Sequence, residues 1–125
     1  MGYYSEVALT LNKVDALELI RKAKGDESGA QSLIAAAQII DHDQCVIFYW
    51  DQVKWYAAFP SVQFIVNFYY DADEYSFKRV GGDYGDIEID ETGDCSDIYE
   101  LSEVLQCINV LPGKPLYVND IWGES

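Results

Sequence analysis

The run CVIFYW, residues 45 to 50, constrains the fold more than any other stretch of this chain. Six consecutive apolar residues, rich in β-branched and aromatic side chains, match the length and composition of a buried strand. The run is far too short to cross a bilayer, which takes roughly 20 apolar residues. It therefore predicts the central strand of a sheet.

The segments before this run predict one strand and two helices. Residues 3–11 alternate with the period of a half-buried strand. Asn12 is a good N-cap, and helical apolar spacing, basic residues and then Gly25 follow it, so a helix is expected between these two residues. Residues 26–40 also show helical spacing and predict a short second helix, and residues 41–43 (Asp-His-Asp) predict a polar turn.

The segments after the central run fit more than one structure. Residues 51–52 predict a turn into a second strand at 53–56. Residues 60–70 alternate like a strand, but Pro60 favours a helix because proline is well tolerated at the first helical position. A polar stripe at helical spacing supports the helix; it consists of Gln63, Asn67 and Tyr70.

The last third of the chain predicts a hairpin followed by an appended tail. Residues 75–80 and 86–90 read as two strands around a glycine-rich turn. Residues 98–111 fit either period, with a strand favoured in their C-terminal half, and residues 116–125 offer Tyr117, Ile121 and Trp122 for docking. The whole chain, 1–125, is expected to be a single α+β domain, in which two or three helices pack on one face of a mostly antiparallel sheet.

Composition narrows the class of protein. Hydrophobic residues make up 50% of the 125 residues, which is enough for a core and excludes a wholly disordered acidic chain. The N-terminus lacks the basic and apolar regions of a signal peptide, and three unevenly spaced cysteines match neither a zinc knuckle nor a disulfide framework. A cytoplasmic protein is expected, without membrane contact.

Negative charge is the main functional signal. The net charge is −14, and residues 71–103 hold twelve acids against Lys78 and Arg79. Direct binding to nucleic acid is disfavoured, because that affinity comes largely from Lys and Arg. The same charge would attract a basic protein surface.

The stretch GGDYGDIEIDETGD, residues 81–94, concentrates six carboxylates and no cation. A calcium loop fits poorly, since Glu91 stands where an EF-hand needs glycine. A catalytic acid pair needs one carboxyl in a buried environment, and nothing in the sequence marks one. Two interpretations stay open: imitation of nucleic acid, and a hairpin whose acids are merely solvated. Acidic side chains at alternate positions of one β-strand are spaced by about 6.7 Å, which is a lower charge density than that of duplex DNA. No catalytic residue, metal ligand or cofactor is predicted.

Aromatic residues next to these acids suggest a protein-binding patch. Twelve of the eighteen aromatic residues fall between Phe48 and Phe77, and several tyrosines adjoin the carboxylates. The candidate partner-binding residues are Asp83, Tyr84, Asp86, Glu88, Asp90, Glu91, Asp94 and Asp97.

Three motifs resemble a set of small acidic, uncharacterised phage and prophage proteins. The motifs are GYYSEVAL near the N-terminus, VKWY followed by FPSV, and YSFKRVGGDYGDIE. The resemblance implies an accessory or counter-defence factor that binds and blocks a host protein, and it brings no catalytic residues.

The sequence thus predicts a non-enzymatic, acidic binding module that docks a basic host protein, such as the nucleic-acid-binding surface of a nuclease. One alternative is an assembly module that forms a homodimer through aromatic surface or a strand edge. The other is a small enzyme that depends on carboxylates or a divalent metal ion.

Overall fold

The computed structural model describes residues 3–42, 44–83, 85–92 and 114–123. Its strands form one antiparallel sheet in the order β5-β4-β1-β3-β2-β6. The strands are β1 (Ser5–Asn12), β2 (Gln38–His42), β3 (Cys45–Val53), β4 (Tyr75–Gly81), β5 (Ile87–Thr92) and β6 (Lys114–Pro115). The helices described are α1 (Lys13–Ala23), α2 (Ala30–Ala35), α3 (Pro60–Tyr70) and α5 (Val118–Trp122).

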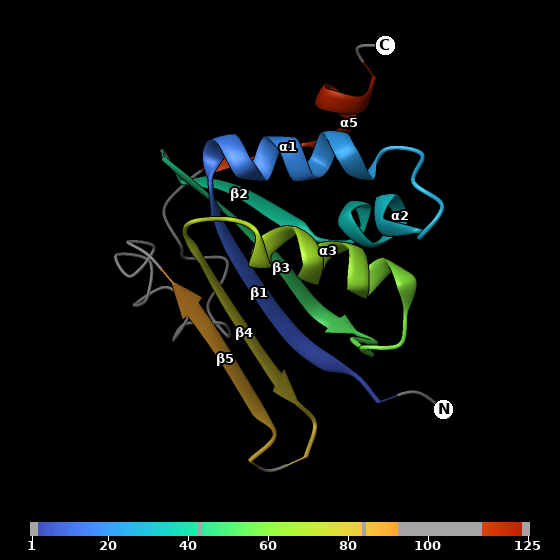
Figure 1. The fold of residues 1–125 in the computed structure, drawn as a ribbon, viewed down its shortest axis with the longest axis vertical. Helices are drawn as coiled ribbons and strands as arrows, with labels where there is room; N and C mark the ends of the chain where they lie inside the picture. Colours follow the sequence, from blue (N-terminus) through green and yellow to red (C-terminus); the bar gives the residue numbers. More distant parts are fainter. Residues whose placement is uncertain (1–2, 43, 84, 93–113, 124–125) are drawn as a thin grey trace.

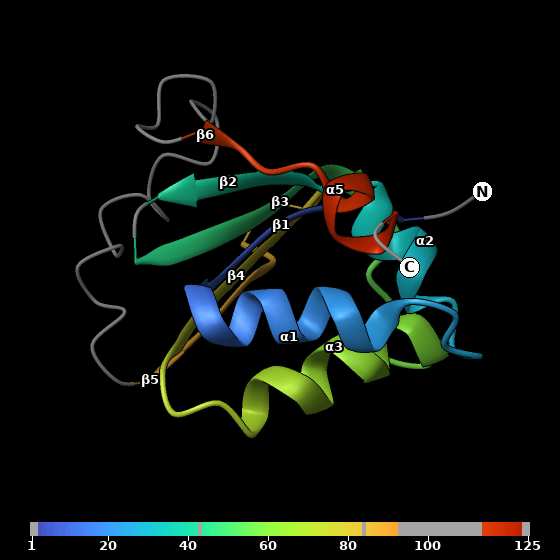
Figure 2. The same cartoon turned by 90° about the horizontal axis from the view of Figure 1, so that it is seen from above.

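The helices α1, α2 and α3 lie on one face of the sheet, as Figures 1 and 2 show. Side chains that alternate along the central strands point at them, including Leu9, Phe48 and Phe77, which are almost wholly buried. The α+β architecture and its antiparallel sheet with helices on one face are as predicted from the sequence.

Local signals explain the first helix and the third. The Asn12 side chain accepts a hydrogen bond of 2.9 Å from the Asp15 N–H, which satisfies one of the unpaired donors at the start of α1. Pro60 stands in the first turn of α3. Both helices confirm the sequence prediction, as does the hairpin of β4 and β5.

The sequence predictions for two regions are wrong. Residues 38–42 form the strand β2 instead of the end of a helix and the start of a turn, and they pair with β3. A salt bridge of 2.9 Å from Lys13 holds Asp41 within this strand. The predicted turn at residues 51–52 and the separate strand at 53–56 are also absent, because β3 continues to Val53, where it pairs with Ser5 of β1, and residues 54–56 are in no strand.

The described part of the C-terminal segment is attached to the domain. The Leu116 N–H donates to the Ile39 carbonyl at 2.8 Å, next to the β2–β6 pairing. Trp122 is buried, and its indole N–H donates to the Ile20 carbonyl at 2.7 Å. Tyr117, in contrast, is 63% exposed and does not dock. The expectation for residues 98–111 lies outside the described residues.

Candidate functional site

A pocket of about 700 Å³ opens on the helix-bearing face of the sheet. Its walls are α3, the segment that precedes α3, and the strands β4 and β5. In Figure 1 the lower halves of β4 and β5 extend beyond the helices.

The wall on α3 carries the polar stripe that favoured a helix in the sequence. Gln63, Asn67 and Tyr70 all line the pocket, because positions three and four apart share one face of a helix. The Gln63 amide donates to the Ala57 carbonyl at 2.9 Å, and this bond ties the helix to the preceding segment. The polar stripe of α3 thus forms one wall of the pocket.

The floor of the pocket is aromatic. Tyr69 stacks on Phe77 with ring centroids 5.3 Å apart, and Trp55 lies against the same phenylalanine at 5.8 Å. These three rings are buried, whereas Tyr70 beside them is 57% exposed. Burial is the first cause that raises the pKa of the Tyr69 phenol above its usual value.

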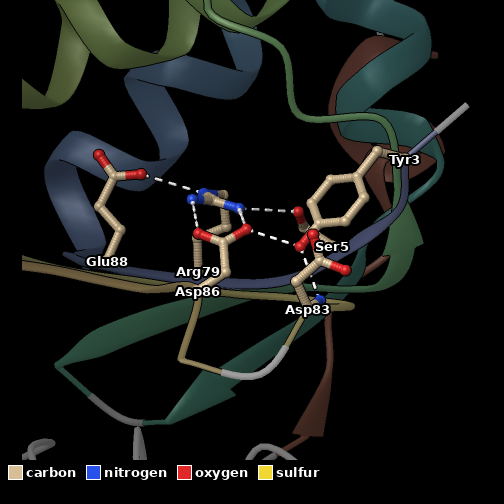
Figure 3. A network of polar contacts seen from close by, with 6 residues as sticks. All are labelled: Tyr3, Ser5, Arg79, Asp83, Asp86 and Glu88. Carbon is tan, nitrogen blue, oxygen red and sulfur yellow. Dashed lines mark hydrogen bonds and ion pairs between the residues drawn. The ribbon is translucent and has the colours of Figure 1, made fainter.

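Arg79 organises the charged end of the pocket (Figure 3). Its guanidinium donates two hydrogen bonds to the Asp86 carboxylate, at 2.8 and 3.2 Å, and one to Glu88 at 3.0 Å. A further bond of 3.0 Å reaches the Ser5 hydroxyl. The two-pronged contact with Asp86 is the strong geometry for an arginine and a carboxylate, so it fixes both side chains.

Tyr3 joins the network from the other end of the chain. Its hydroxyl donates to Asp86 at 2.7 Å and accepts from the Asp83 N–H at 2.8 Å, as Figure 3 shows. The hydrogen bonds from Arg79, and then the one from Tyr3, hold the pKa of Asp86 below its usual value. Asp86 is therefore an ionised structural group as well as part of the acidic face.

Asp90 lies beside the pocket, two residues beyond Glu88 on β5, and is not part of its lining. The Tyr75 hydroxyl donates to it at 3.1 Å. The charge of Asp90 is the first cause that raises the pKa of Tyr70, and Glu88 acts in the same direction. The phenols next to Asp90 thus lie in a negative field.

The structure gathers three of the predicted site residues on one face. Asp86 precedes β5, and Glu88 and Asp90 follow at alternate positions, on the same side of the sheet as α3. Asp83 is exposed in the turn. Glu91 pairs through its backbone with Ser76. Tyr84, Asp94 and Asp97 lie outside the described residues.

The acidic face is less negative than the sequence indicated, because Arg79 lies within it. The three carboxylates of Asp86, Glu88 and Asp90 and one guanidinium leave a charge of 1 − 3 = −2. Lys78 is one position away on β4 and therefore belongs to the opposite face. Tyr3 and Arg79 are the site residues that sequence reasoning missed.

Among the described residues, no cluster of three or more His, Cys, Asp or Glu side chains is arranged to hold a metal ion. None of the described helices is long and apolar enough to span a membrane. No family model, curated protein or solved structure matches this chain.

Proposed function

We propose that this chain is a non-enzymatic acidic binding module that docks a basic surface of another protein through the face formed by α3, β4 and β5. The observation that carries the proposal is the combination of an open aromatic pocket, lined by Asp86 and Glu88, with Asp90 next to them on β5. In line with the resemblance to phage proteins, the proposed partner is a host nuclease or another nucleic-acid-binding protein, and the proposed compartment is the host cytoplasm.

Charge supports this choice of partner. With a net charge of −14, the chain repels phosphates and attracts a basic surface, and such steering raises association rates by about 10 to 10³-fold. The basic surfaces that proteins use to bind nucleic acid are the natural targets for this kind of field.

The pocket supports binding by shape as well as by charge. Tyrosine and tryptophan are enriched in protein interfaces, and the exposed Tyr70 stands beside buried rings that hold its position. Because Arg79 neutralises part of the acidic face, charge density alone is a weak basis for imitation of DNA. A fixed pocket adds the specificity that dispersed charge lacks.

Affinity capture tests the proposal. The immobilised chain is exposed to a bacterial lysate freed of nucleic acid, and the same is done with Glu88→Gln/Asp90→Asn. Both substitutions keep an acceptor oxygen, so Tyr75 and Arg79 retain partners. A matched control, Glu27→Gln/Asp120→Asn, removes two exposed acids elsewhere.

We expect the wild type and the control to retain the same basic protein, to release it between about 0.05 and 0.5 M salt, and to lose it to competing duplex DNA. The double variant at the site should not retain it. The proposal is contradicted if all three proteins capture the same amount of partner, or if the amount captured does not change with salt concentration.

A homodimer through the edge of β5 is the second candidate, and one observation favours it. In the described sheet β5 is an edge strand, and Ile87 and Ile89 on its other face are 57% and 55% exposed. Self-pairing would place Glu88 and Asp90 of two copies close together, which opposes it. Sedimentation at two protein concentrations decides: a tight dimer at both supports the edge, and a monomer supports the first proposal.

A further inference from the structure

We infer that the pocket between α3 and the β4–β5 hairpin receives one arginine or lysine side chain of the partner, together with its flanking backbone. The inference rests on the proposed function and specifies its central contact. The volume of the pocket agrees with such a ligand, because about 700 Å³ lies within the roughly 300–1,000 Å³ typical of pockets that enclose a compact ligand. A long side chain and the adjoining peptide units fit this range.

The carboxylates supply the charge that a cation needs. Arg79 occupies both oxygens of Asp86 but only one oxygen of Glu88, whose side chain is 58% exposed. Asp90, beside the pocket, accepts a hydrogen bond from the neutral Tyr75 hydroxyl and also interacts with the Tyr70 hydroxyl. Glu88 therefore keeps an acceptor oxygen toward the pocket, which a guanidinium or ammonium group would use, and Asp90 beside it adds negative charge.

The electrostatic field within the pocket has the matching sign. The negative charges of Asp90 and Glu88 oppose ionisation of Tyr70 and raise its pKa. A field that disfavours a phenolate at this place favours a positive charge there by the same interaction. An anionic ligand would meet the same repulsion as the phenolate.

Aromatic faces suit the same ligand. Tyr70 is 57% exposed, and Tyr56, from the segment that precedes α3, also lines the pocket. Cations stack on such rings, and the chain itself makes this contact twice elsewhere, with Lys22 5.6 Å from the centre of the Phe68 ring and Lys54 5.7 Å from that of Tyr4. The aliphatic stem of Arg or Lys would cover the buried rings of the floor.

The amides on α3 suit the peptide backbone around that side chain. Gln63 and Asn67 are exposed on the pocket wall. Within the described part of the chain, the Asn67 amide makes no hydrogen bond, so its donor and acceptor are both available. One peptide unit of the partner can satisfy both.

The test is an NMR titration of the ¹⁵N-labelled chain with acetyl-Gly-Arg-Gly-amide. Acetyl-Gly-citrulline-Gly-amide serves as the probe of nearly the same shape without charge. Tyr70→Ala is compared with Tyr117→Ala, since both remove an exposed tyrosine and only the first touches the pocket. The spectra also report whether each variant is folded.

We expect the arginine peptide to shift the side-chain amide signals of Asn67 and Gln63 with a Kd on the order of 1 mM, and the citrulline peptide to bind more weakly by about fivefold or more. Tyr70→Ala should weaken arginine binding by about fivefold, and Tyr117→Ala should leave it unchanged. Equal binding of both peptides, shifts that miss α3, or equal affinity of the two variants would overturn the inference.

The same variants separate this inference from the function beneath it. If Tyr70→Ala captures the basic partner from lysate as well as wild type while Glu88→Gln/Asp90→Asn does not, the acidic module stands and the pocket is refuted. If the arginine peptide binds as expected but no variant changes capture, the pocket stands and the proposed docking face is refuted.

Discussion

Gly81, at the end of β4, is where one added methyl group should disrupt the site. A Cβ at this position would lie 2.1 Å from an Asp86 carboxylate oxygen and 2.2 Å from the Tyr3 hydroxyl, whereas uncrowded contacts lie near 3.5–4.0 Å. Both groups would have to move by more than about 1 Å. That movement would break the bond from Tyr3 to Asp86 and strain the paired bonds from Arg79.

The neighbouring Gly82 provides the matched control. A Cβ there would meet Tyr3 at 3.7 Å and the Tyr4 carbonyl at 3.9 Å, which are ordinary contacts. Neither glycine has a positive φ, so both Gly→Ala changes restrict the unfolded chain by a similar amount, and their difference isolates the steric conflict.

Overpacking of this kind costs about 1–3 kcal/mol, so we expect Gly81→Ala to be about 2 kcal/mol less stable than Gly82→Ala. Urea unfolding followed by tryptophan fluorescence measures both free energies of unfolding. Gly81→Ala should also weaken binding of the arginine peptide, since Arg79 and Asp86 line the pocket. Equal stability of the two variants would refute the packing described around Gly81.

Two further predictions concern the ends of the fold. Trp122→Ala should cost about 3–5 kcal/mol in urea unfolding, because it empties a buried site and leaves the Ile20 carbonyl without its indole donor. Tyr117→Ala removes an exposed side chain from the same C-terminal segment and should change stability by less than about 0.5 kcal/mol. Asp86 has a folded-state pKa below its usual 3.8, so its stabilising contribution is present above about pH 4 and is lost as pH falls through the folded value. The stability difference between wild type and Asp86→Asn should therefore be constant from about pH 7 to 5 and shrink near pH 3, and a difference that persists at pH 3 would contradict the ion pair.

Much of the fold could be predicted because its signals are local. Asn12 and Pro60 fix helix starts through interactions within one turn, and Gly85, with a φ of 82°, allows the turn between β4 and β5. The strand β2 was missed because Ile39 and Ile40 fit a helical spacing as well as a strand. Its polar end resembles a turn until Lys13, far away in sequence, is seen to pair with Asp41.

The site could be predicted only in part, for the same reason. Asp86, Glu88 and Asp90 share a face by simple alternation, and a hairpin in the observed register also places Arg79 opposite Glu88. The pairing of Arg79 with Glu88, which neutralises part of the acidic face, could therefore have been predicted from the sequence. The contact of Tyr3 with Asp86 spans 83 residues and depends on β1 lying beside β4, so no local pattern indicates it.

The internal arginine explains how an acidic pocket can be selective for a cation. Carboxylates on a free hairpin would move with it, and a ligand would bear the entropic cost of ordering them. Here Arg79 and Tyr3 fix Asp86, and Arg79 also holds one oxygen of Glu88, so the remaining acceptors are already in position. Since one guanidinium faces several carboxylates, this order is reached without cancelling the negative charge. A second cation would therefore enter a field that is both negative and fixed in direction, which solvated acids alone do not provide.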